Sequence, residues 1–167
     1  YTWSYTLSLR RSSDLVEPMR QDPEWVNIKD IPKNLRNAVI AIEDHEFYDH
    51  GAIAPESILR AMLVNVIESE ISQGDSTLTQ QFVKNTFLTH EQTMERKIEE
   101  AILAIILEEK YSKDEVLEMY LNSTYFGAGA TGVHQASKVY FGRHVSHLTL
   151  AEAAVLAALP YAPSALC

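Results

Sequence analysis

The stretch "AILAIIL", residues 101–107, is apolar around its whole circumference if it forms a helix. A helix without a polar face is usually buried at the centre of a fold. This stretch therefore predicts the core of the molecule. Glu100 stands immediately before it, and Arg96 and Lys97 precede Glu100 by one helical turn. We expect these three charged side chains to lie close to the core.

Helical patterns extend outward from this stretch in both directions. Apolar residues recur at helical spacing along most of the chain, with no convincing alternating strand and no internal repeat. We expect a helix from about Asp30, capped there, and another from about Pro55. Capping signatures of the form S/T-x-x-E/Q precede further periodic segments at Thr77–Gln80, Thr89–Gln92, Ser112–Glu115 and Thr149–Glu152. The chain is predicted to form a mostly α domain.

Composition excludes several classes of protein. The 167 residues are 46% hydrophobic and 22% charged, which is ordinary for one folded domain. The formal net charge of −9 argues against a nucleic-acid partner. The one cysteine, Cys167, excludes an internal disulfide, and no apolar run of about 18 residues is present to span a bilayer.

The acidic cluster "AIEDHEFYDHG", residues 41–51, is the first candidate for chemistry. Val39, Glu43 and Phe47 are spaced i, i+4, i+8, so on one helix they would share a row on or beside the buried stripe. A carboxylate on an apolar face has a raised pKa, as a general base working near neutral pH requires. The alternative is a helix-end acid that points into water. Spacing alone leaves both readings open.

Histidines in this cluster raise the question of a metal site. His45 and His50 could join Asp44 or Glu46, but their spacing does not match a helical His-x-x-x-His pattern and no cysteine is nearby. A structural role for His50, holding the turn at Gly51, is favoured.

Two further segments combine polar and charged residues. Glu100 with Arg96 and Lys97 is either a set of local ion pairs or a site for an anionic group. Thr77, Gln80 and Lys84 share one helix face at an N-terminus that could receive phosphate, with simple capping as the alternative.

The glycine-rich "GAGATG", residues 127–132, fits G-x-G-x-x-G. It lacks the preceding buried strand that a dinucleotide site needs, so we interpret it as a tight connection with unusual backbone angles.

The order of these motifs resembles one family. "EDHEFYDHG" (43–51), "GDSTLTQQFVKN" (74–85), "RKIEE" (96–100), "KDEVLEMYLNSTYFGAGATGV" (113–133) and "LTLAEAAVLAALPYAPS" (148–164) together resemble the peptidoglycan glycosyltransferases of family 51. These are monofunctional transglycosylases or the transferase half of class A penicillin-binding proteins. The resemblance implies a lysozyme-like helical domain at residues 27–167, truncated at its C-terminal end, after a lead-in at 1–26. It also implies a smaller membrane-associated jaw that includes residues 55–70.

The family's activity is polymerisation of lipid II into β-1,4-linked glycan strands with inversion. By resemblance, Glu43 is the general base and Glu100 assists departure of the lipid pyrophosphate, directly or through a divalent cation (Mg or Mn). The resemblance also assigns pyrophosphate binding to Arg60, Lys84, Arg96 and Lys97. The cleft is shaped by Ser76, Thr77, Gln80 and Gln81, and its supporting residues are Asp44, Phe47, His50, Gly51, Asn122, Tyr125 and Gly127.

The implied partners are lipid II, the lipid-linked nascent glycan, the membrane surface and a fused or separate transpeptidase, with no nucleic acid and no organic cofactor. The implied location is the outer face of the bacterial cytoplasmic membrane, with an anchoring helix absent from this chain. Met62, Leu63, Val66 and Ile67 could then dip into lipid.

Two alternatives stay open. One is a lysozyme-like glycan hydrolase, which shares the fold type and the paired acids, although a neutral glycan needs no clamp of cations. The other is an inactive module that binds lipid II or glycan. It is suggested by Asp75, where the family usually has a glycine, and by the shortened end.

Overall fold

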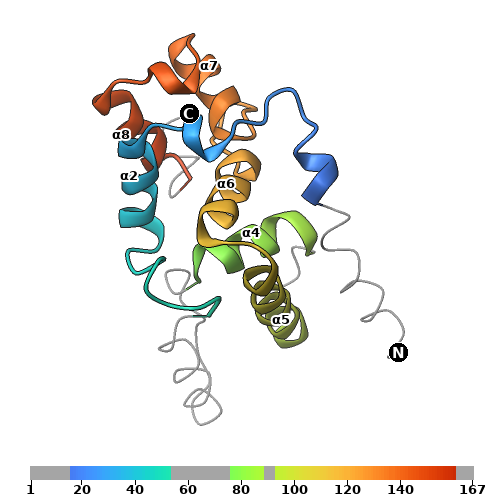
Figure 1. Ribbon diagram of the computed structural model, residues 1–167. Coiled ribbons are helices and arrows are strands. Elements are labelled where there is room, and N and C mark those ends of the chain that lie inside the picture. The colour runs from blue at the N-terminus through green and yellow to red at the C-terminus, as the bar shows by residue number, and fades with distance from the viewer. Residues whose placement is uncertain (1–15, 54–75, 89–92, 161–167) are drawn as a thin grey trace.

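The computed structural model describes residues 16–53, 76–88 and 93–160 (Figure 1). These ranges contain only helices and an isolated β-bridge between Tyr125 and Thr131. In chain order the elements are η1 (Ile28–Asp30), α2 (Lys33–Glu43), α4 (Leu78–Phe87), α5 (Met94–Lys110), α6 (Lys113–Ser123), α7 (Val133–Phe141), η2 (Val145–His147) and α8 (Leu150–Ala158). The predicted mostly α fold is confirmed.

Helix α6 is the centre of this fold. It contacts α4, α5, α7 and η1, and in Figure 1 it lies in the middle of the molecule. Its residues from Val116 to Leu121 are all buried. Helix α2 packs against α8 on one side of this centre. The core is therefore built around α6, with Leu35 and Val39 of α2 among its fully buried members.

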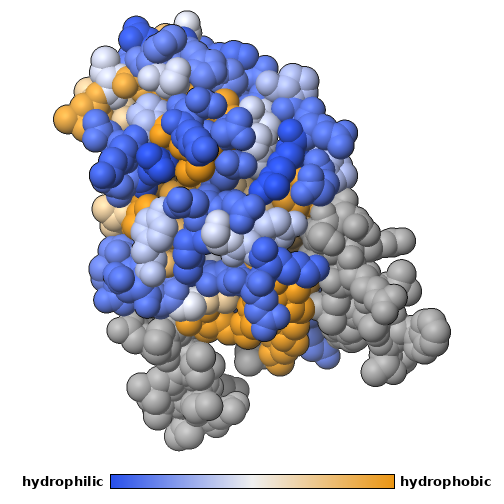
Figure 2. Space-filling view, viewed as in Figure 1, coloured by the Kyte–Doolittle hydropathy of each residue, from blue (hydrophilic) through white to orange (hydrophobic). Residues whose placement is uncertain are grey.

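The prediction that residues 101–107 are the buried centre is wrong. Within this stretch only Ala104 and Leu107 are buried, whereas Ile102 and Ile105 are each 44% exposed. Helix α5 lies at the lower edge of the molecule (Figure 1), and its main contacts among the described elements are with α4 and α6. Its outer face, which also carries the exposed Ile98, therefore has no covering helix among the described elements. Figure 2 shows apolar side chains gathered at this end.

Capping explains where most helices begin. The boxes at Thr77–Gln80, Ser112–Glu115 and Thr149–Glu152 all form, with both reciprocal hydrogen bonds. Helix α5 is capped by Thr93, whose side chain accepts from the Arg96 amide, so the predicted start at Thr89 is four residues early.

The predicted cap at Asp30 is also wrong. Helix α2 begins after Pro32, which has no side-chain capping bond, and Asp30 ends the preceding 3-10 turn. A fixed proline φ near the helical value favours the start of α2 at this position.

The glycine-rich loop between α6 and α7 is a tight connection, as expected. Gly127 and Gly132 both have a φ of 84°. A Cβ at Gly132 would stand 2.6 Å from the backbone oxygen of Asn122, so this position excludes any side chain. The nucleotide-binding interpretation of the motif was correctly set aside, because no strand precedes it in the described chain.

The chain before α2 is attached to α6 by hydrogen bonds. Trp25 Nε1 and the Ile28 amide both donate to the Glu118 carboxylate, at 3.1 and 2.8 Å. Asn122 accepts from the Val26 amide and donates to the Val26 carbonyl, at 2.9 Å each. Asn122 therefore fixes the segment before α2 against α6, and its role in supporting the cleft stays a prediction.

Part of the prediction falls outside the described residues. This applies to the predicted helix near residues 55–70, to Arg60, to the four apolar residues proposed to dip into lipid, and to Asp75. The domain division between residues 26 and 27 is untested and stays a prediction. No helix in the three described ranges has both the length and the apolarity needed to cross a bilayer.

Candidate active site

Glu43 is the last residue of α2. One turn earlier, Val39 is fully buried, so Glu43 stands at the edge of the core as predicted. The helix ends because Asp44 leaves helical geometry, with a φ of −165°. Phe47 therefore does not continue the helical row, although it is also fully buried.

The environment of Glu43 suits a base. Burial raises the pKa of its carboxyl group, and a hydrogen bond from Gln81 partly opposes this rise. The negative end of the α2 dipole acts in the same direction as burial. Gln81 Nε2 donates to Oε2 at 3.1 Å, while Oε1 is buried without a hydrogen-bond partner in the structure. One carboxylate oxygen is thus held in place, and the other has no hydrogen-bond donor among the described residues.

Asp44 and His50 join the end of α2 to the start of α4. His50 Nε2 lies 2.6 Å from one Asp44 oxygen, and His50 Nδ1 lies 2.5 Å from the Gly51 carbonyl oxygen. The Leu78 amide, at the beginning of α4, donates to the second Asp44 oxygen at 2.9 Å. Burial lowers the pKa of His50, but the bonds to Asp44 and Gly51 outweigh it and raise the pKa overall. His50 thus links Asp44 to the Gly51 turn, in line with the structural role that the sequence favours.

No metal centre is evident in this cluster. His45 is 81% exposed through its side chain and approaches only Glu46. Across residues 16–53, 76–88 and 93–160 there is no group of three histidine, cysteine or acidic residues that could hold a metal ion.

Glu100 lies in the interior with two cations from its own helix. Its side chain has no exposed surface. Arg96 Nη1 contacts one carboxylate oxygen at 3.0 Å, and Lys97 Nζ contacts the other. Because all three are on α5 at i, i+3 and i+4 spacing, the local ion pairing expected from the sequence is present.

A chain of hydrogen bonds joins the two acids. Gln81 Nε2, which holds Glu43, also donates to the Ser76 carbonyl at 3.3 Å. Lys97 Nζ, which contacts Glu100, donates to the Ser76 hydroxyl at 2.9 Å. Ser76 is thus the residue through which acids from α2 and α5 are brought into one site. Neither acid is turned outward.

Some of the other predicted cleft residues form contacts within the protein, and others have polar groups left to contact a ligand. Thr77 and Gln80 are buried, and their side chains form the hydrogen bonds of the capping box. The Thr77 hydroxyl also donates to the Ala52 carbonyl at 2.8 Å. Lys84 is half-buried, and the described contacts include no ion pair for it. Tyr125 is 52% exposed and accepts from the Gly129 amide at 3.2 Å, so it braces its own loop.

Several residues of the site were missed from the sequence. Tyr120 is fully buried, its hydroxyl lies 3.5 Å from Gln81 Oε1, and burial raises its pKa. Lys113 Nζ lies 4.6 Å from the centre of the Phe47 ring and 2.8 Å from Glu108, which accepts from Thr79. The available signal was Lys113, the first residue of "KDEVLEMYLN", which lies in a family motif but was assigned no role of its own from the sequence.

Comparison with known proteins agrees with this geometry. The sequence model of the transglycosylase family matches residues 12–167. Penicillin-binding protein 1A of Aquifex aeolicus (strain VF5) is 52% identical over 140 residues, covering 84% of this chain and 19% of that protein. Penicillin-binding protein 1F of Bacillus subtilis (strain 168) is 50% identical over 144 residues, covering 86% and 20%. Penicillin-binding protein 1A of Neisseria lactamica is 47% identical over 145 residues, covering 87% and 18%.

The chain spans about a fifth of the length of these three relatives. Its match nevertheless covers all five motifs and both acids. The chain therefore belongs to the transglycosylase family, the family that its ordered motifs predicted.

Proposed function

We propose that this chain is a peptidoglycan glycosyltransferase unit that polymerises lipid II into β-1,4-linked glycan strands. The observation that carries the proposal is the hydrogen-bonded path from Glu43 to Glu100 through Gln81, Ser76 and Lys97. Cations are gathered at the Glu100 end of this path. The two ends therefore have different electrostatic characters, which a reaction with a hydroxyl nucleophile and an anionic leaving group requires.

Glu43 is the proposed general base. Its free Oε1 accepts the proton of the 4-hydroxyl of the acceptor lipid II as that oxygen attacks the anomeric carbon of the donor. The new glycosidic bond forms while the bond from the anomeric carbon to the lipid pyrophosphate breaks with its electron pair. Attack from the face opposite the leaving group inverts the anomeric centre. Gln81 fixes the direction of the carboxylate during the transfer.

The leaving pyrophosphate is proposed to bind at the cations of α5 and α4. Arg96 Nε is buried without a partner, so this guanidinium retains a donor after its contact with Glu100. Lys84 supplies a further positive charge. Fixed cations stabilise the negative charge that develops on the leaving group. Glu100 positions Arg96 and Lys97 rather than touching the pyrophosphate itself.

A divalent cation remains a separate proposal. Both oxygens of Glu100 are engaged by Arg96 and Lys97, so Glu100 does not fit the role of a metal ligand in this arrangement. We expect any such ion to be held mainly by the pyrophosphate oxygens. Arg60 is likewise proposed for pyrophosphate binding by resemblance alone.

The wider setting follows from the same proposal. Lipid II and the lipid-linked glycan would be met at the membrane surface, on the outer face of the cytoplasmic membrane. A transpeptidase, fused or separate, would use the product. The names of the penicillin-binding relatives support this setting.

The decisive experiment compares two substrates. Wild type is incubated with lipid II and, separately, with lipid-free peptidoglycan, and Glu43→Gln is the matched blank. We expect lysozyme-sensitive polymer from lipid II and no new reducing ends from peptidoglycan. Release of reducing ends would instead identify a hydrolase. Tight binding of lipid II with no turnover by the full-length parent would identify a binding module.

A further inference from the structure

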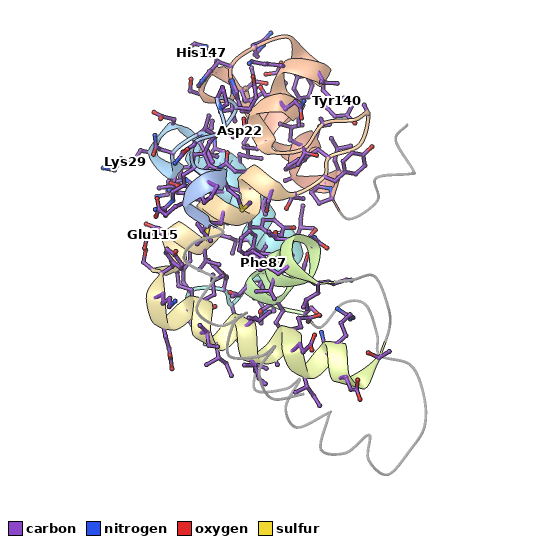
Figure 3. The ribbon with its side chains drawn as sticks, turned by 90° about the vertical axis from the view of Figure 1, so that its right-hand side faces the viewer. Asp22, Lys29, Phe87, Glu115, Tyr140 and His147 are labelled. Carbon is purple, nitrogen blue, oxygen red and sulfur yellow. The ribbon has the colours of Figure 1, made fainter. Side chains whose placement is uncertain are left out.

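A pocket lies beside the site described above, between four separate segments. Its volume is about 380 Å³, at the lower end of the roughly 300–1,000 Å³ typical of small-ligand pockets. Its walls come from the segment before α2, the last turn of α4, the end of α6 and the start of α7. In Figure 3 the label Asp22 marks the first of these walls, and Phe87 marks the end of α4 that supplies the second.

One wall of the pocket belongs to α4, the helix that also carries Gln81. Asn85, in its lining, is one turn of α4 beyond Gln81, which holds Glu43. One helical turn corresponds to about 5–6 Å. The pocket wall at Asn85 therefore lies about one helical turn from the residue that holds Glu43.

The pocket lining carries two acidic side chains, of which Glu24 has a cation partner. Its described lining includes no lysine, arginine or histidine. Both oxygens of Glu24 accept from Lys138 at 2.9 Å, and Asp22 accepts from the Glu24 amide at 2.8 Å. Because the lining contains two acids and no cation, it disfavours an anionic ligand such as phosphate. The lining therefore favours an uncharged ligand.

The remaining polar groups suit hydroxyls. Asn85 and Thr86 make no side-chain hydrogen bond in the structure. Gln135 accepts from the Thr131 amide through Oε1 at 2.7 Å, which leaves its amide nitrogen available. Amides both donate and accept, as sugar hydroxyls and acetamido groups also do.

Trp25 adds a fixed apolar surface. Its indole nitrogen donates to Glu118 at 3.1 Å, and the ring packs against the core while staying partly accessible. A ring anchored in this way loses little entropy when a ligand stacks on it. Flat aromatic faces beside free amides recognise the axial C–H groups and hydroxyls of a pyranose.

We propose that this pocket binds an uncharged N-acetylated sugar unit of the glycan strand. The proposal rests on the proposed function for the identity of the glycan, and it assigns the pocket a role in binding that strand away from the reacting bond. The pyrophosphate would stay with Arg96 and Lys97.

The test is an NMR titration of this chain with chitotriose, which has neither lipid nor pyrophosphate. We expect chemical-shift changes at the Trp25 indole and at the side-chain amides of Asn85 and Gln135. Inorganic pyrophosphate should leave these signals unmoved. The double variant Thr86→Val, Gln135→Leu should weaken chitotriose binding about 5–10-fold, the loss of one or two neutral hydrogen bonds. Gln21→Leu, on the same segment as Trp25 but outside the pocket, should bind as wild type does.

The outcomes separate this inference from the proposed function. Chitotriose binding that persists in Glu43→Gln, or in a chain that fails to polymerise lipid II, supports the pocket irrespective of the chemistry. Polymerisation with no response of Trp25 to chitotriose, unchanged binding by a folded double variant, or displacement of chitotriose by pyrophosphate overturns the pocket assignment.

Discussion

Glu43 and Glu100 have the same side chain and opposite surroundings. Glu43 is half-buried at a helix end, with a neutral amide on one oxygen and no partner on the other. Glu100 is completely buried in mid-helix, with an arginine and a lysine on its two oxygens. Burial raises the pKa of the first. The second is a charge kept in the interior by two charges of opposite sign.

This difference shows how a fold assigns distinct tasks to identical groups. A base needs a carboxylate that gains from taking a proton, and Glu43 has that environment. An acid that holds two cations in place needs a contact with each, and Glu100 makes both. The contrast predicts that substitution of Glu43 will mainly lower activity, whereas substitution of Glu100 will mainly lower stability.

Removing the proposed base should have the largest effect. Glu43→Gln should lower lipid II polymerisation by roughly 10²–10⁴-fold, the usual contribution of general base catalysis. Unfolding free energy should change by less than about 1 kcal/mol, because a half-buried acid with one unpaired oxygen is replaced by a neutral isostere. Glu46→Gln, three residues on and 60% exposed through its side chain, is the control. Polymerisation near the wild-type rate in folded Glu43→Gln would remove the base assignment.

Glu100→Gln should instead reduce stability. Loss of the carboxylate leaves Arg96 and Lys97 without their shared counter-charge, and breaking buried ion pairs costs about 3–5 kcal/mol. Because these cations are 13% and 29% exposed through their side chains, we expect about 2–3 kcal/mol. Urea unfolding is the measurement, with Glu95→Gln on the same helix as control. A stability equal to wild type would mean that solvent already screens the pair.

The pH profile sharpens the comparison further. The Gln81 hydrogen bond lowers the pKa of Glu43, so Gln81→Met should raise that pKa further above the ordinary value of 4.5. The acidic limb of kcat/KM, on which activity rises as the base ionises, should then move to higher pH. A limb that stays in place would show that another group controls it.

The pH dependence of the unfolding free energy should reflect protonation of the same carboxyl group, Glu43. A carboxyl whose pKa is raised by folding contributes stability below its unfolded pKa, and that contribution is lost as pH rises through the folded pKa. Glu43→Gln should flatten this part of the stability profile, whereas Glu46→Gln should not. Thermal unfolding across this pH range measures the difference.

The smallest expected effect is at the link between the acids. Ser76→Ala removes the hydroxyl that Lys97 contacts but leaves the carbonyl that Gln81 contacts. We expect a loss of about 1 kcal/mol in unfolding free energy, typical of one hydrogen bond. In a double-mutant cycle with Glu100→Gln the two losses should not add, because both act on Lys97. Additive losses would mean that Ser76 and Glu100 are independent.

Prediction from the sequence succeeded where the signal was local. Three of the capping boxes and the glycine loop each depend on residues within a few positions of one another. The prediction failed for α5, where apolar composition indicated a central helix but Ile102 and Ile105 face outward. The composition of a helix determines how much apolar surface it has, whereas the elements packed against it determine how much of that surface is buried.

The candidate site shows the same division. Its ion pairs within α5 follow from i, i+3 and i+4 spacing, so they could be predicted without knowledge of the tertiary fold. The contacts of Gln81 with Glu43 and of Lys97 with Ser76 join residues 38 and 21 positions apart. No local pattern encodes such contacts, because they depend on the packing of α4 between α5 and α6.

Local chemistry along the chain was therefore sufficient for the family, the helical class, most helix starts and the pairing of Glu100 with its cations. Tertiary packing alone placed Glu43 within reach of Ser76, exposed one face of α5 and made α6 the core. The physical reason is that capping and helix-face pairing act within one turn, whereas burial and desolvation depend on which elements meet in space.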